Sequence, residues 1–471
     1  MRREILAEII ANETRIIVLE DGRPLDIFIE RESKKSIIGN IYLGRVQKCS
    51  KGISAAFVDI GLKKSGFLPL RKGQRLNEGE LVKVQITRDA YGEKGPQLTQ
   101  ELSISGRFLV YKPSGNKVSV SKKILDDNEK RRLVSILGCQ TVQEECWIAR
   151  TLSVGVGELE LKSEIFNLRR IWNILETNFA GKTYPGIFYQ EISPVIKTLR
   201  DHVAVDVNRI VISGVDDYTA AKNWCRNFAP EISKIIESYN GQISLFQKFG
   251  VQEFVDDLLE NKIMLPSGGN IIIEPTEALT VIDVNSGANL DGSISYDNAL
   301  MTNLEAAKEC CRQIRLRNIS GIIIIDFVKS ENADMWCKIT NIIKGCLAKD
   351  RVPARVLGKT DAGLLEIIRK RSSPPLTEIV CQPCKFCNGN GYEAQPEFLI
   401  FSIIADLRQM RDCHQGGVVL VEASLDIINC LQELYSSGKE MAIAIGIGCL
   451  LDYKVDHNLP CGKYQISYNQ M

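Results

Sequence analysis

Two apolar runs, each carrying an aspartate at or near its end, constrain the fold of this chain more than any other feature. The runs are Leu279-Thr280-Val281-Ile282-Asp283-Val284-Asn285-Ser286 and Ile322-Ile323-Ile324-Ile325-Asp326-Phe327. Runs this rich in β-branched residues are typical of central strands in a sheet covered on both faces. They predict an α/β fold in which both aspartates lie at one rim of the sheet, where open α/β folds place their sites.

Two carboxylates that meet at a sheet rim repel each other unless a proton or a cation lies between them. Mg²⁺ suits such a position, because it takes one or two carboxylates and keeps several waters. Asn285, two residues after Asp283, is placed to orient a neighbouring carboxylate or a bound water. For either aspartate alone, the alternative is the N-cap of the next helix.

Residue usage excludes some chemistries. The three histidines, His202, His414 and His457, have no Ser, Cys or second His at a suggestive spacing. Histidine-based RNA cleavage and a Ser-His-Asp triad are therefore disfavoured, and a metal-activated water remains. The 15 cysteines are an odd number and mostly scattered, which favours reduced thiols. With no signal peptide at the N-terminus and no apolar run long enough to span a bilayer, we predict a cytoplasmic protein.

A basic segment lies within a chain of balanced charge. The 471 residues carry a net charge of +1, yet residues 37–118 hold 14 Lys and Arg against 6 Asp and Glu. Such a local excess is typical of a polyanion site, although a chance excess on a solvated surface is the alternative. The segment also reads as short strands broken by Gly and Lys turns, which favours a small closed barrel.

Aromatic residues of this barrel are candidates for stacking on bases. Tyr42, Phe57 and Phe67 are interleaved with lysines and arginines that would hold phosphates, although aromatics in small barrels are more often core. The phrases Ala56-Phe57-Val58-Asp59-Ile60-Gly61 and Gly66-Phe67-Leu68-Pro69 resemble the RNA-binding oligonucleotide barrels of the ribosomal S-one type.

Longer phrases extend the resemblance to nearly the whole chain. They are Leu265-Pro266-Ser267-Gly268-Gly269, Glu277 to Ser286, Thr302-Asn303-Leu304-Glu305-Ala306-Ala307, Arg312-Gln313-Ile314-Arg315-Leu316-Arg317 and Gly321 to Phe327. In this order they are similar to the RNase E/G family of bacterial endoribonucleases. The resemblance implies that Asp283 and Asp326 bind the catalytic Mg²⁺, that Asn285 helps to orient them, and that hydrolysis leaves a 5′-phosphate and a 3′-hydroxyl.

The resemblance also implies contacts to the RNA away from the cleaved bond. Arg150 and Thr151 match an Arg-Thr pair that senses a 5′-monophosphate, although an exposed Arg-Thr pair by itself usually has no such role. Arg315 and Arg317, close to the strand of Asp326, and the cluster of Arg369 and Arg371 are predicted to hold flanking phosphates. Ordinary compensation of a helix dipole is the alternative for the arginines of the helix.

A cysteine cluster, Cys381-Gln382-Pro383-Cys384-Lys385-Phe386-Cys387, has the spacing of a zinc knuckle. Zinc needs four ligands, so either a partner chain supplies two of them or Cys413 and His414 complete the site. The resemblance implies sharing, with Cys384 and Cys387 of each protomer clamping one Zn²⁺ in a homodimer. It leaves open a tetramer of two dimers, and Cys381 receives no role.

The resemblance implies a multidomain α/β architecture. Its parts are an RNase H-like unit of 1–36 plus 188–258, an inserted oligonucleotide-binding barrel of 37–109, a 5′-sensor of 110–187, a DNase I-like catalytic domain of 259–380, a zinc link of 381–393 and a small α/β domain of 394–471. The chain ends without the long polar arm that scaffolds a degradation complex in larger members, so its size resembles the RNase G branch more.

We therefore predict a Mg²⁺-dependent endoribonuclease that cleaves single-stranded, A/U-rich RNA in rRNA processing and mRNA turnover and favours 5′-monophosphorylated substrates. Two alternatives stay open. One is a non-catalytic RNA-binding or ribosome-assembly protein, against which the presence of Asp283, Asp326 and Asn285 argues. The other is a metal-dependent DNA nuclease, which a comparison of RNA with DNA cleavage would distinguish.

Overall fold

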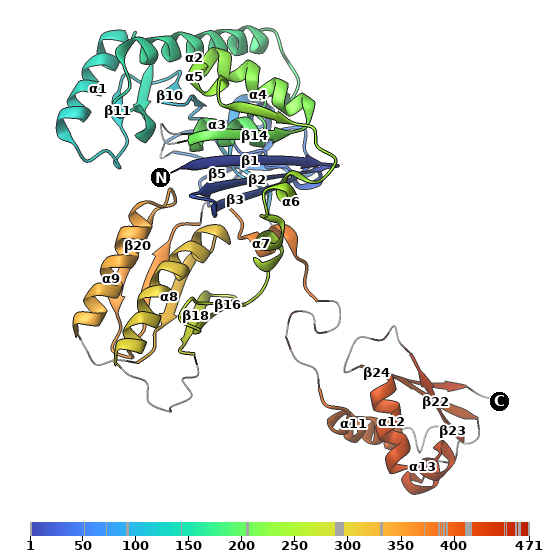
Figure 1. Ribbon diagram of the computed structural model, residues 1–471. Coiled ribbons are helices and arrows are strands. Elements are labelled where there is room, and N and C mark those ends of the chain that lie inside the picture. The colour runs from blue at the N-terminus through green and yellow to red at the C-terminus, as the bar shows by residue number, and fades with distance from the viewer. Residues whose placement is uncertain are drawn as a thin grey trace. The chain divides into compact units, whose positions relative to one another are not determined.

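The computed structural model divides the chain into two compact units, Met1–Ile379 and Val380–Met471, which are described separately (Figure 1). It describes residues 2–50, 52–71, 73–90, 94–142, 144–203, 207–287, 296–329, 333–371, 373–384, 387, 389, 391, 394–409, 417–446, 448, 450–456, 459 and 463–469. Both units are mixed α/β.

The first sheet joins the N-terminus to a segment 200 residues later, because β1 pairs in parallel with β14. β2 and β3 follow β1 as hairpins, and the turn between them places Asp21 and Gly22 at φ 49° and 78°, as a two-residue type I′ turn requires. The strands, in sheet order, are β15 (Ile236–Tyr239), β14 (Val207–Ser213), β1 (Arg3–Ile10), β2 (Glu13–Glu20) and β3 (Arg23–Arg31).

Side chains that alternate along these strands bury both faces of the sheet. Ile5 and Ile16 belong to the core on one face, with residues of α3, α4 and α5, while Leu6 and Ile17 pack on the other with residues of α6 and α7. The helices are α3 (Pro194–His202), α4 (Val215–Phe228), α5 (Pro230–Ser233), α6 (Leu245–Lys248) and α7 (Gln252–Asp257). The predicted boundaries of an RNase H-like unit here remain a prediction.

A closed barrel of five strands follows, because β7 pairs with both β8 and β4. Its strands are β4 (Ile41–Ser50), β5 (Ala55–Asp59), β6 (Gly66–Pro69), β7 (Leu81–Arg88) and β8 (Gln97–Thr99), and β13 (Gly186–Tyr189) adds to the β4 edge. The last barrel strand ends at Thr99, whereas the prediction extended the barrel to residue 109.

Next to the barrel, a four-stranded sheet packs against two helices. Its core contains Trp147 of β12 together with Leu161, Leu168 and Trp172 of the long helix α2. The strands, in sheet order, are β11 (Val118–Val120), β12 (Cys146–Ala149), β10 (Leu109–Lys112) and β9 (Ile104–Ser105), and the helices are α1 (Asp127–Gln140) and α2 (Glu158–Phe179).

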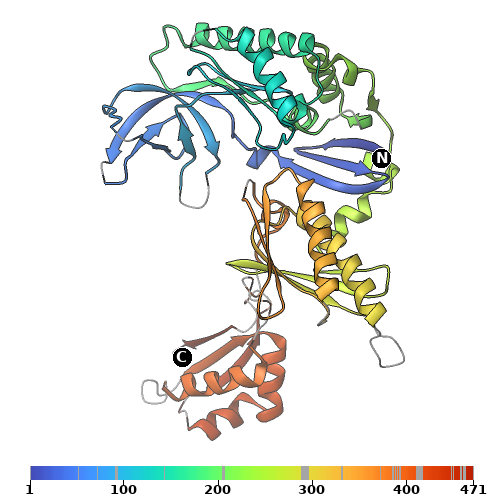
Figure 2. The ribbon, with the colours of Figure 1, turned by 90° about the vertical axis from the view of Figure 1, so that its left-hand side faces the viewer.

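A six-stranded sheet completes the first unit and contains both predicted aspartate strands. In sheet order its strands are β16 (Lys262–Met264), β17 (Asn270–Pro275), β18 (Leu279–Asn285), β19 (Gly321–Asp326), β21 (Leu365–Arg369) and β20 (Ala354–Lys359). Helices α8 (Tyr296–Leu316) and α9 (Ala333–Ala348) cover one face, as Figure 2 shows. The opposite face carries exposed Ile322 and Ile368, so the expectation of a sheet covered on both faces is wrong within this unit.

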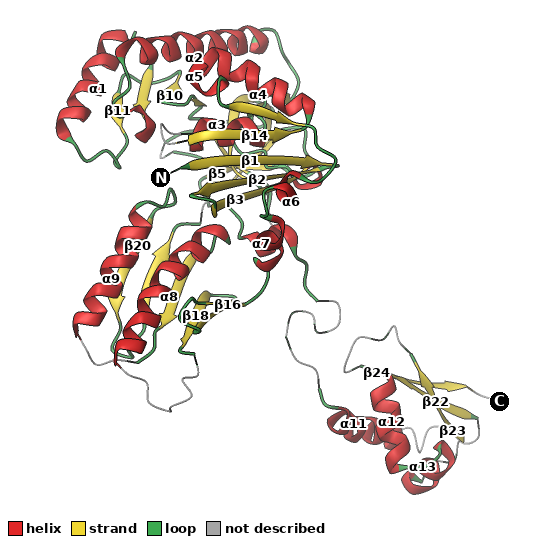
Figure 3. Ribbon diagram, in the orientation of Figure 1, coloured by secondary structure: helices red, strands yellow, loops and turns green. Residues whose placement is uncertain are grey.

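The second unit packs helices against a three-stranded sheet of order β23-β22-β24 (Figure 3). Its elements are α11 (Pro396–Gln409), β22 (Val418–Ala423), α12 (Leu425–Leu434), α13 (Gly438–Ile445), β23 (Leu450–Val455) and β24 (Tyr464–Asn469), and α10 (Leu376–Val380) lies at the division between the units. Among the described residues of the whole chain, no helix has the length and apolarity needed to cross a membrane.

Candidate active site

The two predicted aspartates are direct neighbours in the six-stranded sheet. β18 and β19 are parallel, and their register pairs Asp283 with Asp326. Parallel neighbours lie about 4.8 Å apart, and paired side chains point to the same face. Both aspartates are half-buried, and they alternate with buried Ile282 and Ile325, so they lie on the face opposite α8 and α9.

Local geometry identifies these aspartates as strand residues. Asp326 is the last residue of β19, and Asp283 lies inside β18, which continues to Asn285. The helices that follow begin only at Tyr296 and Ala333, so the N-cap alternative is wrong for both aspartates.

Two asparagines flank this pair on the same face. Asn285 Nδ2 donates a hydrogen bond to Asp283 Oδ2 at 2.8 Å, which orients the carboxylate as the sequence predicts. Asn270 of β17 pairs with Asn285 across the antiparallel ladder, and its buried Oδ1 has no hydrogen-bond partner among the described residues. Asn270 was not predicted from the sequence; its signal was a polar residue that opens an alternating strand directly after Gly268-Gly269.

A glycine turn supports the rim on the Asn285 side. A Cβ on Gly269 would lie 2.6 Å from the Asn285 carbonyl oxygen, and a Cβ on Gly287 would lie 2.7 Å from the Gly268 carbonyl oxygen. Both contacts are with backbone atoms, which cannot move away as the end of a flexible side chain can. The two backbones therefore approach as closely as they do only because neither residue carries a side chain.

Substitution of Gly269 by Ala should shift the Asn285 backbone and lower cleavage activity by about 10-fold to 100-fold, because small displacements of positioned groups carry that cost. Steady-state rates on a short RNA would measure the loss. Gly268→Ala is not a clean comparison, since Gly268 has φ +84°. Gly345→Ala, in α9, is the matched control and should keep full activity, because no atom of the described residues outside this helix's own backbone lies within 4 Å of its Cβ position.

The donors at this rim suit a hard divalent cation. The rim carries two carboxylates, an amide that orients one of them, and the buried amide oxygen of Asn270. Oxygen atoms of carboxylates and amides are the ligands that Mg²⁺ prefers. Within the described residues, no group of three or more His, Cys, Asp or Glu side chains is arranged to bind a metal. Two carboxylates can hold Mg²⁺ when water molecules supply its remaining ligands.

Four predicted RNA-binding arginines lie at the other end of this sheet. Arg369 pairs with Gly321 at the start of β19, about 16 Å from Asp326 along the strand, and Arg371 packs over Gly321. α8 runs back along the sheet from β18 to β19, so its C-terminal arginines also lie at the start of β19. Arg315 and Arg317 are therefore near Asp326 in sequence but far from it along the strand.

Three of these arginines are occupied inside the protein. Arg369, 2% exposed, binds Asp350 and the Ile319 carbonyl oxygen. Arg317, 6% exposed, binds Gln313 and the Glu260 carbonyl oxygen. Arg315 forms a two-pronged ion pair with Asp26. The prediction that Arg315, Arg317 and Arg369 contact RNA is wrong in this structure, because Arg317 and Arg369 are buried and the Arg315 side chain, 14% exposed, is paired with Asp26. Exposed Arg371 stays a prediction.

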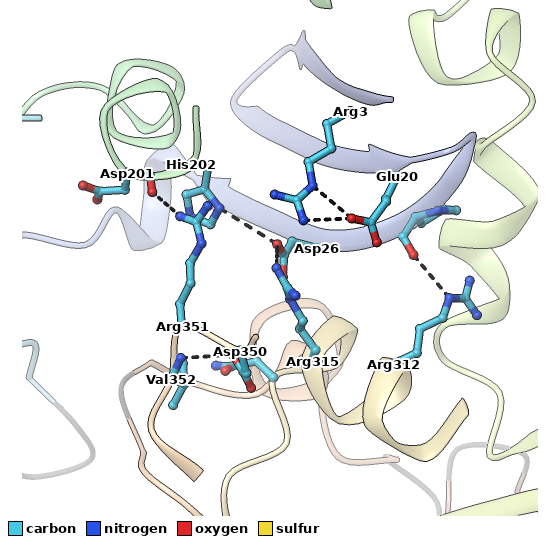
Figure 4. A network of polar contacts seen from close by, with 12 residues as sticks. Arg3, Glu20, Asp26, Asp201, His202, Arg312, Arg315, Asp350, Arg351 and Val352 are labelled. Carbon is cyan, nitrogen blue, oxygen red and sulfur yellow. Dashed lines mark hydrogen bonds and ion pairs between the residues drawn. The ribbon is translucent and has the colours of Figure 1, made fainter. Parts of the chain in front are cut away.

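The Asp26–Arg315 pair belongs to a polar junction between the six-stranded sheet and the N-terminal sheet (Figure 4). Arg351 donates to the Asp201 carbonyl oxygen, and His202 Nδ1 lies 4.0 Å from Asp26. Burial and the charge of Arg351 lower the pKa of His202 to about 3, so this histidine is neutral. It lies at the junction and not among the aspartates.

The three barrel aromatics divide between core and surface. Phe57 and Phe67 are paired across β5 and β6, half-buried, with ring centroids 6.0 Å apart. Tyr42 is 5% exposed and packs inside the barrel, so the prediction that Tyr42 stacks on RNA is wrong. Lys63 and Lys64, in the turn that connects β5 with β6, are exposed.

Arg150 and Thr151 lie side by side at the end of β12. Thr151 is exposed, with its hydroxyl 3.1 Å from Ser121 Oγ. Arg150 donates to the Gly106 carbonyl oxygen and to Asp201 Oδ1, each at 2.6 Å. Burial raises the pKa of Asp201, but hydrogen bonds and charge from Arg200 and Arg150 bring it down to about 2, so Arg150 faces an ionised carboxylate.

The segment under Arg150 is held by one buried acid, Glu164 of α2. Its carboxylate accepts the N–H groups of Phe108 and Leu109, and Phe108 in turn accepts the Arg150 N–H. Burial raises the pKa of Glu164 to about 7, despite these backbone hydrogen bonds.

Glu164 should make the stability of the protein fall as the pH rises from about 4.5 to about 7. In that window the unfolded chain has lost the proton that the folded state keeps, so a rise in pH stabilises the unfolded state relative to the folded state. Glu164→Gln, which keeps an acceptor, should remove a pH-dependent difference on the order of 3 kcal/mol. Denaturant unfolding at pH 5 and pH 8 would measure it, and equal differences from wild type at both pH values would contradict it.

The knuckle cysteines lie in the second unit. Cys381 and Cys384 are exposed, and Cys387 accepts the Gly391 N–H at 3.3 Å. That hydrogen bond, with one from Gly389, lowers the pKa of Cys387. Such N–H groups directed at sulfur suit a metal-bound thiolate. Cys413 and His414, the alternative zinc ligands, lie outside the described residues, as does His457.

Comparisons with known proteins identify the family of this chain. A sequence model of the Ribonuclease E/G family matches residues 103–372. Ribonuclease G of Escherichia coli K12 is 32% identical over 469 residues, which cover 95% of this chain and 96% of that protein. Ribonuclease G of Haemophilus influenzae is 30% identical, with 96% of each chain covered. Ribonuclease E of the same organism is 29% identical over 87% of this chain and 46% of its own length.

Proposed function

This chain belongs to the ribonuclease E/G family and is an endoribonuclease, and we propose that it hydrolyses single-stranded RNA with Mg²⁺ held by Asp283 and Asp326. The observation that carries the proposal is the register that pairs these two aspartates on the open face of one sheet. The products are a 5′-phosphate and a 3′-hydroxyl, and the substrates are A/U-rich segments of rRNA precursors and mRNA in the cytoplasm.

The residues of the rim have distinct tasks in this proposal. When bound, Mg²⁺ supplies a more acidic water and neutralises charge on the scissile phosphate. Asp283 and Asp326 provide one carboxylate each from a rigid pair of strands. Asn285 holds Asp283 Oδ2 through its amide hydrogen, which leaves Oδ1 directed away from that bond. Because the other face of the sheet is covered by helices, RNA approaches from the open face.

Two further regions bind the RNA in this proposal. Phe57 and Phe67 stack bases at the barrel surface, with exposed lysines nearby for phosphates. Arg150 and Thr151 receive a 5′-monophosphate. Arg150 has five N–H donors, and its two hydrogen bonds to protein use only some of them. Thr151 is exposed. Exposed Arg371 serves RNA beyond the cleavage site.

A cleavage assay with Mg²⁺ tests the proposal. The substrates are one A/U-rich 20-nucleotide RNA with a 5′-monophosphate, 5′-hydroxyl or 5′-triphosphate, and the matched single-stranded DNA. We expect cleavage of RNA only, fastest with the 5′-monophosphate, and an Arg150→Gln variant that loses this preference. Cleavage of the DNA at a similar rate would favour a DNA nuclease, and binding of RNA without cleavage would favour the non-catalytic alternative.

The proposal includes the family architecture, with a DNase I-like catalytic domain and an RNase H-like unit. It also includes a shared zinc site, in which Cys384 and Cys387 of each protomer clamp one Zn²⁺. Two thiolates from each chain complete the four ligands of zinc. Replacement of both cysteines by Ser, or chelation of zinc, should convert a dimer into a monomer. Light scattering would measure the mass. Cys139→Ser, at an exposed cysteine of the first unit, is the control, and a Cys384/Cys387 variant that remains dimeric would contradict the shared site.

A further inference from the structure

The position of Asp326 depends on the chain that follows it. The ladder with β18 ends at the Asp283–Asp326 pair, and the ladder with β21 ends one residue earlier, at Ile325. Asp326 is therefore held by strand pairing on one side only. Phe327 is buried, with its ring edge-on to Trp336 at 6.0 Å, but Val328 has left the sheet and its backbone needs other partners.

Asn303 of α8 supplies those partners. Its Nδ2 donates to the Val328 carbonyl oxygen at 2.9 Å, and its Oδ1 accepts the Val328 N–H at 3.0 Å. One amide thus satisfies both backbone groups of one residue, as a neighbouring strand would do. Asn303 is 0% exposed, so no water competes for these bonds.

The same turn of α8 also contacts the rim on the Asp283 side. Glu305 Oε2 accepts the Ser267 N–H at 2.9 Å. The methyl group of Thr302 lies 3.0 Å from the position of a Cβ on Gly269, the residue that abuts the Asn285 backbone. Residues 302–305 therefore touch the loops beside both aspartates. These residues belong to one of the phrases that carry the family resemblance.

We propose that Asn303 is a positioning residue that holds Asp326 beside Asp283 at the separation needed to share one divalent cation. This inference rests on the proposed function of the two aspartates. Asn303 touches neither RNA nor metal, and it acts through the backbone of Val328. Residues that support metal ligands in this way typically change metal affinity or activity by 10-fold to 100-fold when they are replaced.

The test measures metal binding without RNA. Mn²⁺ serves as the probe, and its free concentration is followed by electron paramagnetic resonance; the relevant site is the binding that Asp326→Asn removes. Asn303→Leu, which has the same number and branching of side-chain heavy atoms but can form neither bond, should raise the Mn²⁺ Kd by about 10-fold or more. Cleavage should show a similar loss in kcat with little change in KM.

Two further variants keep the test decisive. Asn303→Ala leaves space for water at Val328 and serves if Asn303→Leu does not fold; it too should weaken Mn²⁺ binding. Ile314→Ala removes fully buried side-chain atoms at the other end of α8, so it should lower the melting temperature without changing the Mn²⁺ Kd.

The outcomes separate this inference from the function on which it rests. A wild-type Mn²⁺ Kd in a folded Asn303→Ala protein would overturn the positioning role, as would an equal change in Ile314→Ala. Retained cleavage and Mn²⁺ binding in Asp326→Asn would instead overturn the proposed site of metal binding.

Discussion

Replacement of Asp283 or Asp326 by Asn is expected to lower the cleavage rate by at least about 10³-fold while RNA binding is kept. Asn retains the size of the side chain but loses the charge that holds the cation, and the loss corresponds to about 4 kcal/mol of transition-state stabilisation. Single-turnover cleavage with saturating enzyme would measure the rate, and a gel-shift titration would measure binding. Because the site is one pair, the double variant should be no slower than either single variant.

Asp257→Asn is the matched control for this experiment. It makes the same change of charge on an exposed residue at the end of α7 and should cleave at the wild-type rate. Wild-type cleavage by either Asp283→Asn or Asp326→Asn would show that the paired carboxylates have another role.

The second large effect concerns stability. Arg369→Met should destabilise the first unit by about 3–5 kcal/mol, because it leaves Asp350, 6% exposed, as a buried carboxylate without its cation. Denaturant unfolding, with hydrogen exchange of β20 and β21 as a local probe, would measure the change. Since the chain has more than one unit, the local probe identifies the transition that matters.

Two comparisons make the assignment specific to this ion pair. Arg371→Met, at an exposed arginine two residues later, should change stability by less than about 0.5 kcal/mol. The pair of changes Arg369→Met and Asp350→Asn should recover part of the lost stability, since no unpaired charge remains. A double variant less stable than Arg369→Met would contradict this explanation.

The aspartates and the arginines show why sequence reasoning succeeded at one place and failed at another. Asp283 and Asp326 follow runs whose alternation and β-branched residues already indicate strands, and two strands joined by one helix are usually parallel neighbours. Their meeting was therefore predictable. Arg315 and Arg317 were assigned to RNA from their charge and their closeness in sequence to Asp326, and Arg369 from its place in a basic cluster. Neither charge nor sequence position reveals the partner: Arg315 binds Asp26, 289 residues away in the chain.

The barrel shows the same division. Short strands with Gly turns predicted it, and its closure through β7 and β4 confirms that prediction. Which aromatic rings face outward depends on the register of each strand, since a shift of one residue exchanges the two faces. Tyr42 accordingly packs inside, whereas Phe57 and Phe67 lie together near the surface.

By itself, the sequence determined the family, the strands of the catalytic sheet, the barrel and the pair of aspartates, because strand patterning and acidic side chains are local properties that neighbouring residues express. Only the tertiary structure decided which charged groups are exposed and which form ion pairs and hydrogen bonds inside the protein. It alone revealed Asn270 on the face of the aspartates and Asn303 at the chain that follows Asp326. Hydrogen bonds and ion pairs act over a few ångströms, so their partners are known only once distant segments have been brought together.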